Sequence, residues 1–319
     1  MFICSTTILA CCANTQLTKE HQGNIEHNDE RRNILESKTI SINHKGKSFQ
    51  LPFVVKKATS VYLYSLLDYE ATCRLFEKEN YKPIMLVTPE GQKKAAGFIN
   101  VVDYQKTSAV PYREWAFCIF VIAKDKDAPK VYYINETSLL FQSILDDERI
   151  GYSVFSPKMI LSESLPTEIG FEYYGLPKEV GEVNFNYDHP KTEFSVSTQS
   201  GPWVMKASLP KKSSGFSKLG VLVDMVKAYK IGLVFQSMKK KEFSAILVGS
   251  ANIHAKMATI KSKRDPGTEM FTWNKQESQI EINSGSQWGK VLLDLMFEPQ
   301  LVCFAPNLEF ELSAPVDQI

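Results

Sequence analysis

The stretch "EWAFCIFVIAK", residues 114 to 124, is an almost unbroken run of apolar and aromatic side chains. A strand that faces water on one side alternates between apolar and polar residues, whereas a strand buried on both faces reads as a continuous apolar run. We therefore expect residues 114 to 124 to form a central strand of a sheet or a strand of a barrel. Just upstream, residues 82 to 104 predict a strand, a turn at "PEGQ" and a second strand.

The rest of the chain predicts many short strands. A hairpin is expected around the turn "KGK" at residues 45 to 47, because apolar runs lie on both sides of it. Further strands are expected over residues 182 to 188, 192 to 198, 202 to 209, 241 to 250, 279 to 285, 288 to 295 and 308 to 315. Residues 214 to 230 could be helix or strand, since their periodicity does not decide between the two.

Few helices are expected, over residues 68 to 80, 135 to 147 and 165 to 175. Asp68 can serve as the N-cap of the first. The third has Pro166 in its first turn and Gly175 at its end, the positions that these residues favour. No Pro- and Gly-rich linker divides the chain, so the pattern predicts one α+β domain built around a curved or closed antiparallel sheet.

The N-terminal segment has a different character. "MFICSTTILACCA" is a short apolar run that ends in small residues, and a long polar stretch follows it. One interpretation is an exported protein with a signal peptide and a lipid-anchored Cys11 or Cys12. The other is a cytoplasmic protein with a disordered N-terminus, and the absence of basic residues before the apolar run leaves both open. In either case we expect a leader and tether over residues 1 to 37 and a folded domain over residues 38 to 319.

Charge and motifs exclude several classes of function. The 37 Lys and Arg residues nearly balance the 36 Asp and Glu residues, so no overall field favours nucleic acid, and no apolar stretch is long enough for a transmembrane span. The five histidines are isolated in the sequence, which predicts no metal site. No glycine-rich nucleotide motif and no nucleophile elbow is present, so no cofactor is expected.

The strongest candidate for chemistry is Lys178, in "GFEYYGLPKEVG" at residues 170 to 181. A lysine amine attacks a carbonyl carbon only when it is neutral, and its ordinary pKa is about 10.4. Burial beside Phe171, Tyr174 and their neighbours would lower the pKa of Lys178 by disfavouring the ammonium. A lysine next to a proline is also typical of a solvated turn, and the residues alone leave both interpretations open.

The segment around Lys178 resembles the signature of the acetoacetate decarboxylase family. Gly170, Glu172, Pro177 and Lys178 match that signature in spacing. About sixty residues upstream, "GFINVVDYQKTSAVPYREWAFCIFV" is similar to the paired strands of the family, in which a small-residue turn leads into Tyr-x-Glu. Tyr112 and Glu114 occupy those positions, and the two motifs occur in the right order.

The resemblance implies a cone-like β-barrel with a few surrounding helices, usually oligomeric. It implies a lyase that acts on a β-keto acid or related small carbonyl compound, with Lys178 as the Schiff-base nucleophile. Glu114 would be the pocket carboxylate that orients substrate or moves a proton. Glu172 would help to hold the loop, and Lys47 would stand in for a substrate-binding arginine.

The chain departs from the family pattern in three places. Glu179 stands where active decarboxylases carry a second lysine, and Phe171 replaces an arginine. A second acidic pocket residue of the family falls near Ile99 or Asn100 and is absent. If Glu179 approached Lys178 it would stabilise the ammonium, whereas pointing away it would leave desolvation to act. These departures keep open a divergent relative that binds an apolar carbonyl or acid ligand in the barrel without turnover.

Overall fold

The computed structural model describes residues 40–88, 90–125, 132–133, 153–188, 190–210, 242–263 and 267–317. The expected leader, the helix expected over residues 135 to 147 and the ambiguous segment 214 to 230 lie outside the described residues.

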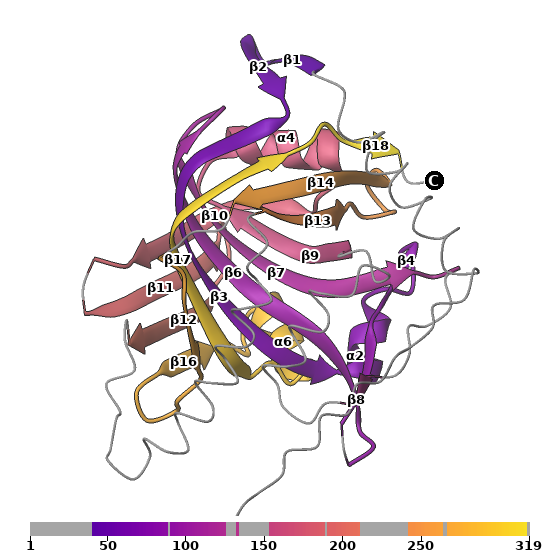
Figure 1. Ribbon diagram of the computed structural model, residues 1–319, viewed down its shortest axis with the longest axis vertical. Helices are drawn as coiled ribbons and strands as arrows, with labels where there is room; N and C mark the ends of the chain where they lie inside the picture. The colour runs from indigo at the N-terminus through magenta and orange to yellow at the C-terminus, as the bar shows by residue number, and fades with distance from the viewer. Residues whose placement is uncertain are drawn as a thin grey trace, which may run out of the picture.

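A closed barrel of seven strands forms the centre of the protein. Its strands are β3 (Phe53–Asp68), β6 (Lys93–Thr107), β7 (Tyr112–Ala123), β9 (Ser153–Leu161), β13 (Glu242–Val248), β14 (Lys256–Lys263) and β17 (Pro299–Leu312). The ring runs β9–β13–β14–β17–β3–β6–β7 and returns to β9, and the long strands curve side by side in Figure 1. Neighbours are antiparallel except β9 and β13, which are parallel. The expected barrel and the buried strand over residues 114 to 124 are both confirmed.

A second sheet branches from the barrel at β9. Strand β10 (Lys178–Asn186) pairs in parallel with β9, and the sheet continues antiparallel through β11 (Lys191–Thr198), β12 (Trp203–Pro210) and β16 (Gln279–Ile282). Strand β9 therefore has β7, β13 and β10 as partners along its length. Because β10 begins at Lys178, this branch point positions the candidate nucleophile.

Shorter elements complete the described structure. The hairpin expected around "KGK" is confirmed as β1 (Ile40–His44) and β2 (Lys47–Leu51). The others are β4 (Tyr81–Pro83), β5 (Met85–Val87), β8 (Tyr132–Tyr133), β15 (Glu269–Thr272) and β18 (Val316–Asp317).

The described helices are α2 (Tyr69–Arg74), α4 (Ser164–Tyr174) and α6 (Gln287–Asp294). Asp68 caps α2 as expected, accepting a hydrogen bond from the Ala71 amide (2.7 Å). The helix expected over residues 68 to 80 is too long, however. After Arg74 the chain forms a tight turn that brings Phe76 against Phe155, with ring centroids 5.1 Å apart.

The strand expected over residues 288 to 295 is wrong, because these residues form α6 and its C-cap. Ser286 caps this helix by accepting from the Gly289 amide (2.8 Å). Buried Leu292 and Leu295 and half-buried Trp288 and Val291 follow the helical spacing i, i+3, i+4, i+7. The helical spacing was already visible in "WGKVLLDL", and it is a better guide to the structure of this stretch than the apolar composition from which a strand was predicted.

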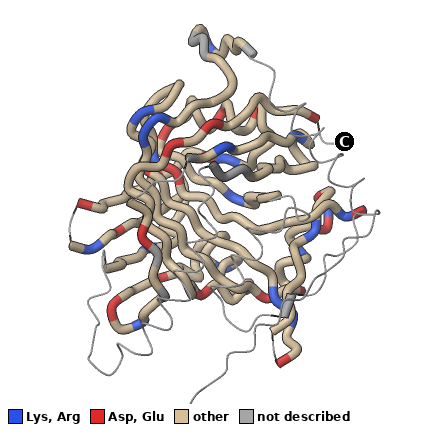
Figure 2. Tube along the Cα trace, in the orientation of Figure 1, with Lys and Arg blue, Asp and Glu red and all other residues tan. Residues whose placement is uncertain are grey.

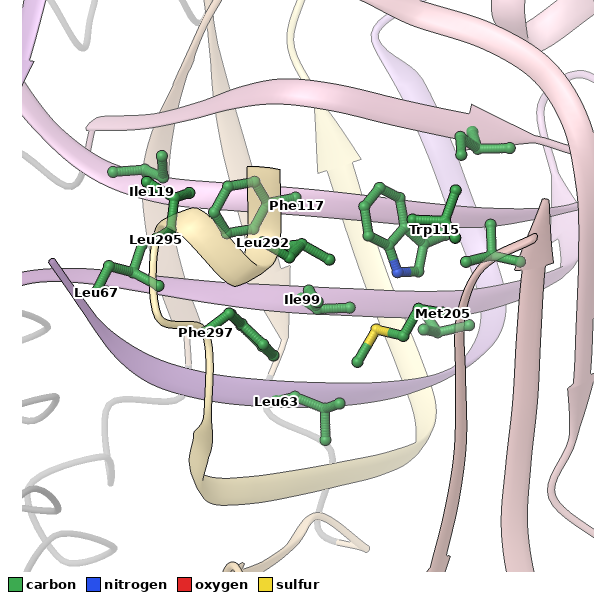
Figure 3. Close-up of a cluster of buried hydrophobic side chains, with 14 of the residues drawn as sticks. Leu63, Leu67, Ile99, Trp115, Phe117, Ile119, Met205, Leu292, Leu295 and Phe297 are labelled. Carbon is green, nitrogen blue, oxygen red and sulfur yellow. The ribbon is translucent and has the colours of Figure 1, made fainter. Parts of the chain in front are cut away.

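The barrel strands separate two hydrophobic cores, because successive side chains of a strand point to opposite faces. The outer core fills the layer between the barrel, the second sheet and α6. Figure 3 shows part of it, where side chains of β3, β6 and β7 face Met205, Leu292, Leu295 and Phe297. The inner core lies inside the ring and is rich in aromatic residues, including Phe98, Tyr104, Tyr112, Phe120 and Phe310.

Charges of both signs are interspersed along the chain in Figure 2. None of the helices in the described residues has the length and apolar character that a membrane span requires.

Candidate active site

Lys178 is held in place by the end of helix α4. Gly175 caps the helix in the left-handed conformation (φ 64°), and the Leu176 amide donates to the Gly170 carbonyl (3.0 Å). A Cβ at Gly175 would lie 2.0 Å from the His254 carbonyl oxygen, so only glycine fits. The chain then enters β10, where Lys178 stands opposite Met159 of β9.

Lys178 and Glu114 form a buried ion pair. The Lys178 Nζ lies 3.0 Å from Glu114 Oε2, and the two side chains are only 9% and 5% exposed. Glu114 belongs to β7 and alternates with Tyr112 and Ala116 of the inner core, so the pair lies on the inner side of the strands. The two residues that the sequence motifs selected independently are therefore in direct contact.

Gly170 provides the space that the lysine side chain occupies. A Cβ at this position would lie 2.3 Å from Lys178 Cδ and 2.5 Å from Cε. Real Cβ atoms do not approach other heavy atoms this closely, so any larger residue would displace the lysine chain. The glycine of the sequence motif thus has a direct steric role beside Lys178.

Two tyrosines surround the carboxylate. The Tyr104 hydroxyl donates to Glu114 Oε1 (3.3 Å), and the Tyr104 ring stacks on Tyr112 with centroids 4.3 Å apart. Burial, together with the nearby Glu114 charge, raises the pKa of both tyrosines well above the ordinary phenol value. Both therefore remain protonated near neutral pH, and Tyr104 acts as a hydrogen-bond donor.

Glu179 points away from Lys178. Its carboxylate forms an ion pair with Lys158, whose ammonium also lies 5.9 Å from the centre of the Trp288 ring. Consecutive residues of a strand face opposite sides, so Glu179 lies in the outer layer while Lys178 faces inward. The sequence left the direction of Glu179 open, and the structure pairs it with Lys158.

The other expected site residues have different positions. Tyr174 is buried, and its hydroxyl donates to the Ser313 carbonyl (3.1 Å). Phe171 is 44% exposed, so the expectation that it buries Lys178 is wrong, because it lies on the solvent side of α4. Glu172 is also exposed, with one oxygen 3.5 Å from Nδ1 of His44 in the hairpin. Lys47 begins β2, and its side chain lies outside the described residues.

Sequence reasoning missed the polar residues on neighbouring strands. Asn100 stands opposite Ala116, which in turn stands opposite Met159, the partner of Lys178. The Ser60 hydroxyl donates to Asn100 Oδ1 (2.5 Å). The alternation in "FINVVDY" was the available signal, since it puts Asn100 and Tyr104 on the same face of β6.

Two open surface clefts lie near the start of β7. Their volumes are about 460 and 580 Å³, and both are lined by Asp103, Arg113 and Asn184. Neither is lined by Lys178 or Glu114. The candidate site therefore rests on the buried pair and its inward-facing neighbours.

Comparison with known proteins supports the fold. No protein-family model matches the sequence, and no curated protein matches it significantly. Among solved structures, acetoacetate decarboxylase from Legionella pneumophila is similar over 83% of this chain and 87% of its own, with a TM-score of 0.50 and 10% identity. A second acetoacetate decarboxylase structure is similar over 83% and 88% of the two chains, with the same TM-score and identity. This likeness establishes an acetoacetate decarboxylase-like fold.

Proposed function

We propose that the protein is a carbon–carbon lyase that forms a Schiff base through Lys178 with a β-keto acid or related carbonyl compound. The observation that carries the proposal is the buried contact between Lys178 Nζ and Glu114 Oε2 at 3.0 Å. An amine nucleophile needs an environment that excludes water and a general base within hydrogen-bond distance, and Lys178 has both. The resemblance of the two motifs to those of the acetoacetate decarboxylase family supports the same assignment.

Proton transfer along this contact would generate the nucleophile. The Glu114 carboxylate accepts a proton from the ammonium, which leaves a neutral amine and a neutral acid. A low-dielectric environment penalises separate charges and so reduces the cost of this exchange. The Tyr104 hydroxyl bond to the other carboxylate oxygen holds the acid in position.

The covalent steps then follow from imine chemistry. The neutral amine adds to the carbonyl carbon, and loss of water gives a protonated imine. When a bond to the neighbouring carbon breaks, its electron pair moves into the imine and forms an enamine, and carbon dioxide or an aldehyde departs. Loss of water uses the proton that Glu114 took from the ammonium, so the Glu114 carboxylate takes up a new proton, from the β-hydroxyl group in aldehyde release or from solvent in decarboxylation, and transfers it to the enamine carbon. Water then hydrolyses the resulting imine to release product and free Lys178.

Binding without turnover is the alternative function. Its support in the sequence is Glu179 in place of a lysine and Phe171 in place of an arginine. Because Lys158 holds the Glu179 carboxylate, that acid does not neutralise Lys178. The catalytic proposal is therefore favoured, and turnover decides between the two.

Reductive trapping tests the nucleophile. The protein is treated with cyanoborohydride and a panel of ketones and keto acids, and adducts are located by peptide mass spectrometry. We expect an adduct on Lys178, no adduct at that peptide in Lys178→Met, and normal labelling in Lys275→Met, which removes an exposed lysine that is also paired with a carboxylate, that of Glu298. Absence of an adduct on Lys178 with every compound would contradict the proposal.

Glu114→Gln separates binding from catalysis. The amide cannot accept the proton, so we expect turnover of a trapped substrate to fall by about a hundredfold or more, the usual contribution of a general base. Reductive trapping of Lys178 in Glu114→Gln should persist at high pH, where the amine is neutral without a general base. Unchanged turnover in Glu114→Gln would remove Glu114 from the mechanism.

A further inference from the structure

The inner faces of four barrel strands carry almost no charge. We consider the inward-facing positions 60 to 66 of β3, 96 to 104 of β6, 112 to 120 of β7 and 301 to 305 of β17, taking every second residue. Among these described positions Glu114 is the one Asp, Glu, Lys or Arg residue. Lys178 reaches this surface from β10 and balances it, so the pair is neutral overall.

At these described positions a ligand carboxylate would therefore find no second cation. The imine formed by Lys178 keeps one positive charge, which the Glu114 carboxylate already matches. Burying a further unpaired carboxylate is unfavourable, because it loses its hydration and gains no partner. An uncharged carbonyl compound has no such penalty.

Aromatic rings lie on the inner faces of β3 and β6, where Tyr62 stands opposite Asn100. Tyr62, Tyr64 and Phe98 lie next to one another on β3 and β6, with ring centroids between 5.4 and 6.1 Å apart. All three are half-buried, so part of each ring remains available for contact. Burial raises the pKa of both tyrosines, which keeps this surface uncharged near neutral pH.

Asn100 adds a neutral polar group at a suitable position. It lies diagonally across the β6–β7 ladder from Glu114, and such diagonal neighbours are about 7 to 8 Å apart. Its Oδ1 is occupied by the Ser60 hydroxyl, and its NH₂ group has no hydrogen-bond partner among the described residues. That group can donate to a ligand hydroxyl or carbonyl oxygen while the carbonyl carbon is at Lys178.

From these observations we infer that the substrate is an uncharged carbonyl compound bearing an aromatic group, which rests on the proposed Schiff-base function of Lys178. The ring lies against Tyr62, Tyr64 and Phe98, and Asn100 binds an oxygen near the reacting carbon. With no carboxylate to lose, the substrate is a β-hydroxy ketone whose carbon–carbon bond breaks by the aldehyde-releasing route: the Glu114 carboxylate takes the β-hydroxyl proton, the aldehyde departs, and the electron pair of the broken bond forms the enamine.

Two matched pairs of ketones test charge and ring separately. Levulinate and its methyl ester differ in charge, and butan-2-one and 4-phenylbutan-2-one differ in the phenyl group. The readout is the concentration that gives half-maximal reductive labelling of Lys178. We expect the half-maximal concentration to be about tenfold lower for the ester than for the acid. We also expect it to be about tenfold lower for the phenyl ketone than for butan-2-one, the change expected for burying one ring.

Tyr62 provides the control variants. Tyr62→Leu should lose most of the preference for the phenyl ketone while butan-2-one labels as before, whereas Tyr62→Phe should keep the preference. Labelling by levulinate that equals or exceeds labelling by its ester would overturn the uncharged substrate, and equal labelling by the other two ketones would overturn the aromatic group. Either result would leave the Schiff base intact, whereas no labelling of Lys178 by any of the four would refute the proposed function itself.

Discussion

At the scale of single residues, the site depends on an absent side chain as much as on the groups present. Gly170 and Lys178 are in contact only because residue 170 has no Cβ. The lysine chain crosses the helix at this point and continues to Glu114. The spacing of Gly170 and Lys178 in the sequence motif therefore reflects a packing requirement between helix α4 and strand β10.

Gly170→Ala tests that requirement. Alanine favours helix over glycine by about 1 kcal/mol, so we expect little or no loss of thermal stability. The new methyl group should push the lysine chain away from Glu114 and reduce reductive labelling of Lys178 about tenfold or more. Phe171→Ala, at the exposed neighbouring position, is the control and should label normally. Full labelling of Gly170→Ala would show that the lysine chain has another route.

The contact between Lys178 and Glu114 was predictable at this scale, because two motifs in the expected order and spacing selected both residues. The direction of Glu179 was not, because it depends on the face of β10 that Lys178 occupies. The exposure of Phe171 could not be inferred either, since the face that α4 presents to the barrel is set by tertiary packing.

At the scale of elements, a charged cluster attaches the N-terminal hairpin to α4. Glu168 of α4 accepts from Lys45 Nζ (2.6 Å) and contacts His44 Nε2 (2.5 Å). Hydrogen bonds from Lys45 and then from His44 lower the pKa of Glu168 below its ordinary value of 4.5. The hairpin therefore supports the helix whose last turn positions Lys178.

This cluster predicts a pH dependence. Since the pKa of Glu168 is lower in the folded than in the unfolded protein, its contribution to stability is present above pH 4.5 and is lost as the pH falls through the folded-state pKa. Glu168→Gln should lower the melting temperature by about 1 to 3 °C at neutral pH, as expected for a partly exposed ion pair. The difference from the unchanged protein should vanish once the pH falls below the folded-state pKa of Glu168. A difference that persisted in acid would show that packing, and not charge, connects the hairpin to α4.

Alternating or continuous apolar runs predicted many of the described elements, but not the barrel strands β9 and β14. Strands β6, β7, β10, β11 and β12 were expected because their runs are long and bounded by turns. Helix α6 was missed because the prediction followed the apolar composition of this short stretch and not its helical spacing. Helix α2 ends early because Phe76 is drawn against Phe155.

At the scale of the whole molecule, the same strands support two independent cores. Phe117 of β7 is fully buried in the outer core and meets Phe297 edge-on, with centroids 6.2 Å apart. Glu114 on the same strand faces the other side. Closure of the ring could not be derived from the sequence, because the pairing of β9 with β13 joins segments more than ninety residues apart.

The separation of the cores predicts that stability and chemistry can be changed independently. Phe117→Ala should lower the free energy of unfolding by about 3 to 5 kcal/mol, measured by denaturant titration, because it leaves a cavity in the outer core. Reductive labelling of Lys178 should stay unchanged in the folded protein. If the alanine variant does not fold, Phe117→Leu removes less volume and serves the same comparison. Loss of labelling in a folded Phe117 variant would show that the cores are coupled.

The position of β17 has a consequence for biosynthesis. This strand completes the ring by standing between β14 and β3, yet it is synthesised more than 230 residues after β3. Until then β3 has an unpaired edge in the nascent chain, open to association with other chains. We expect such a chain to depend on chaperones that shield β3 until β17 has been synthesised.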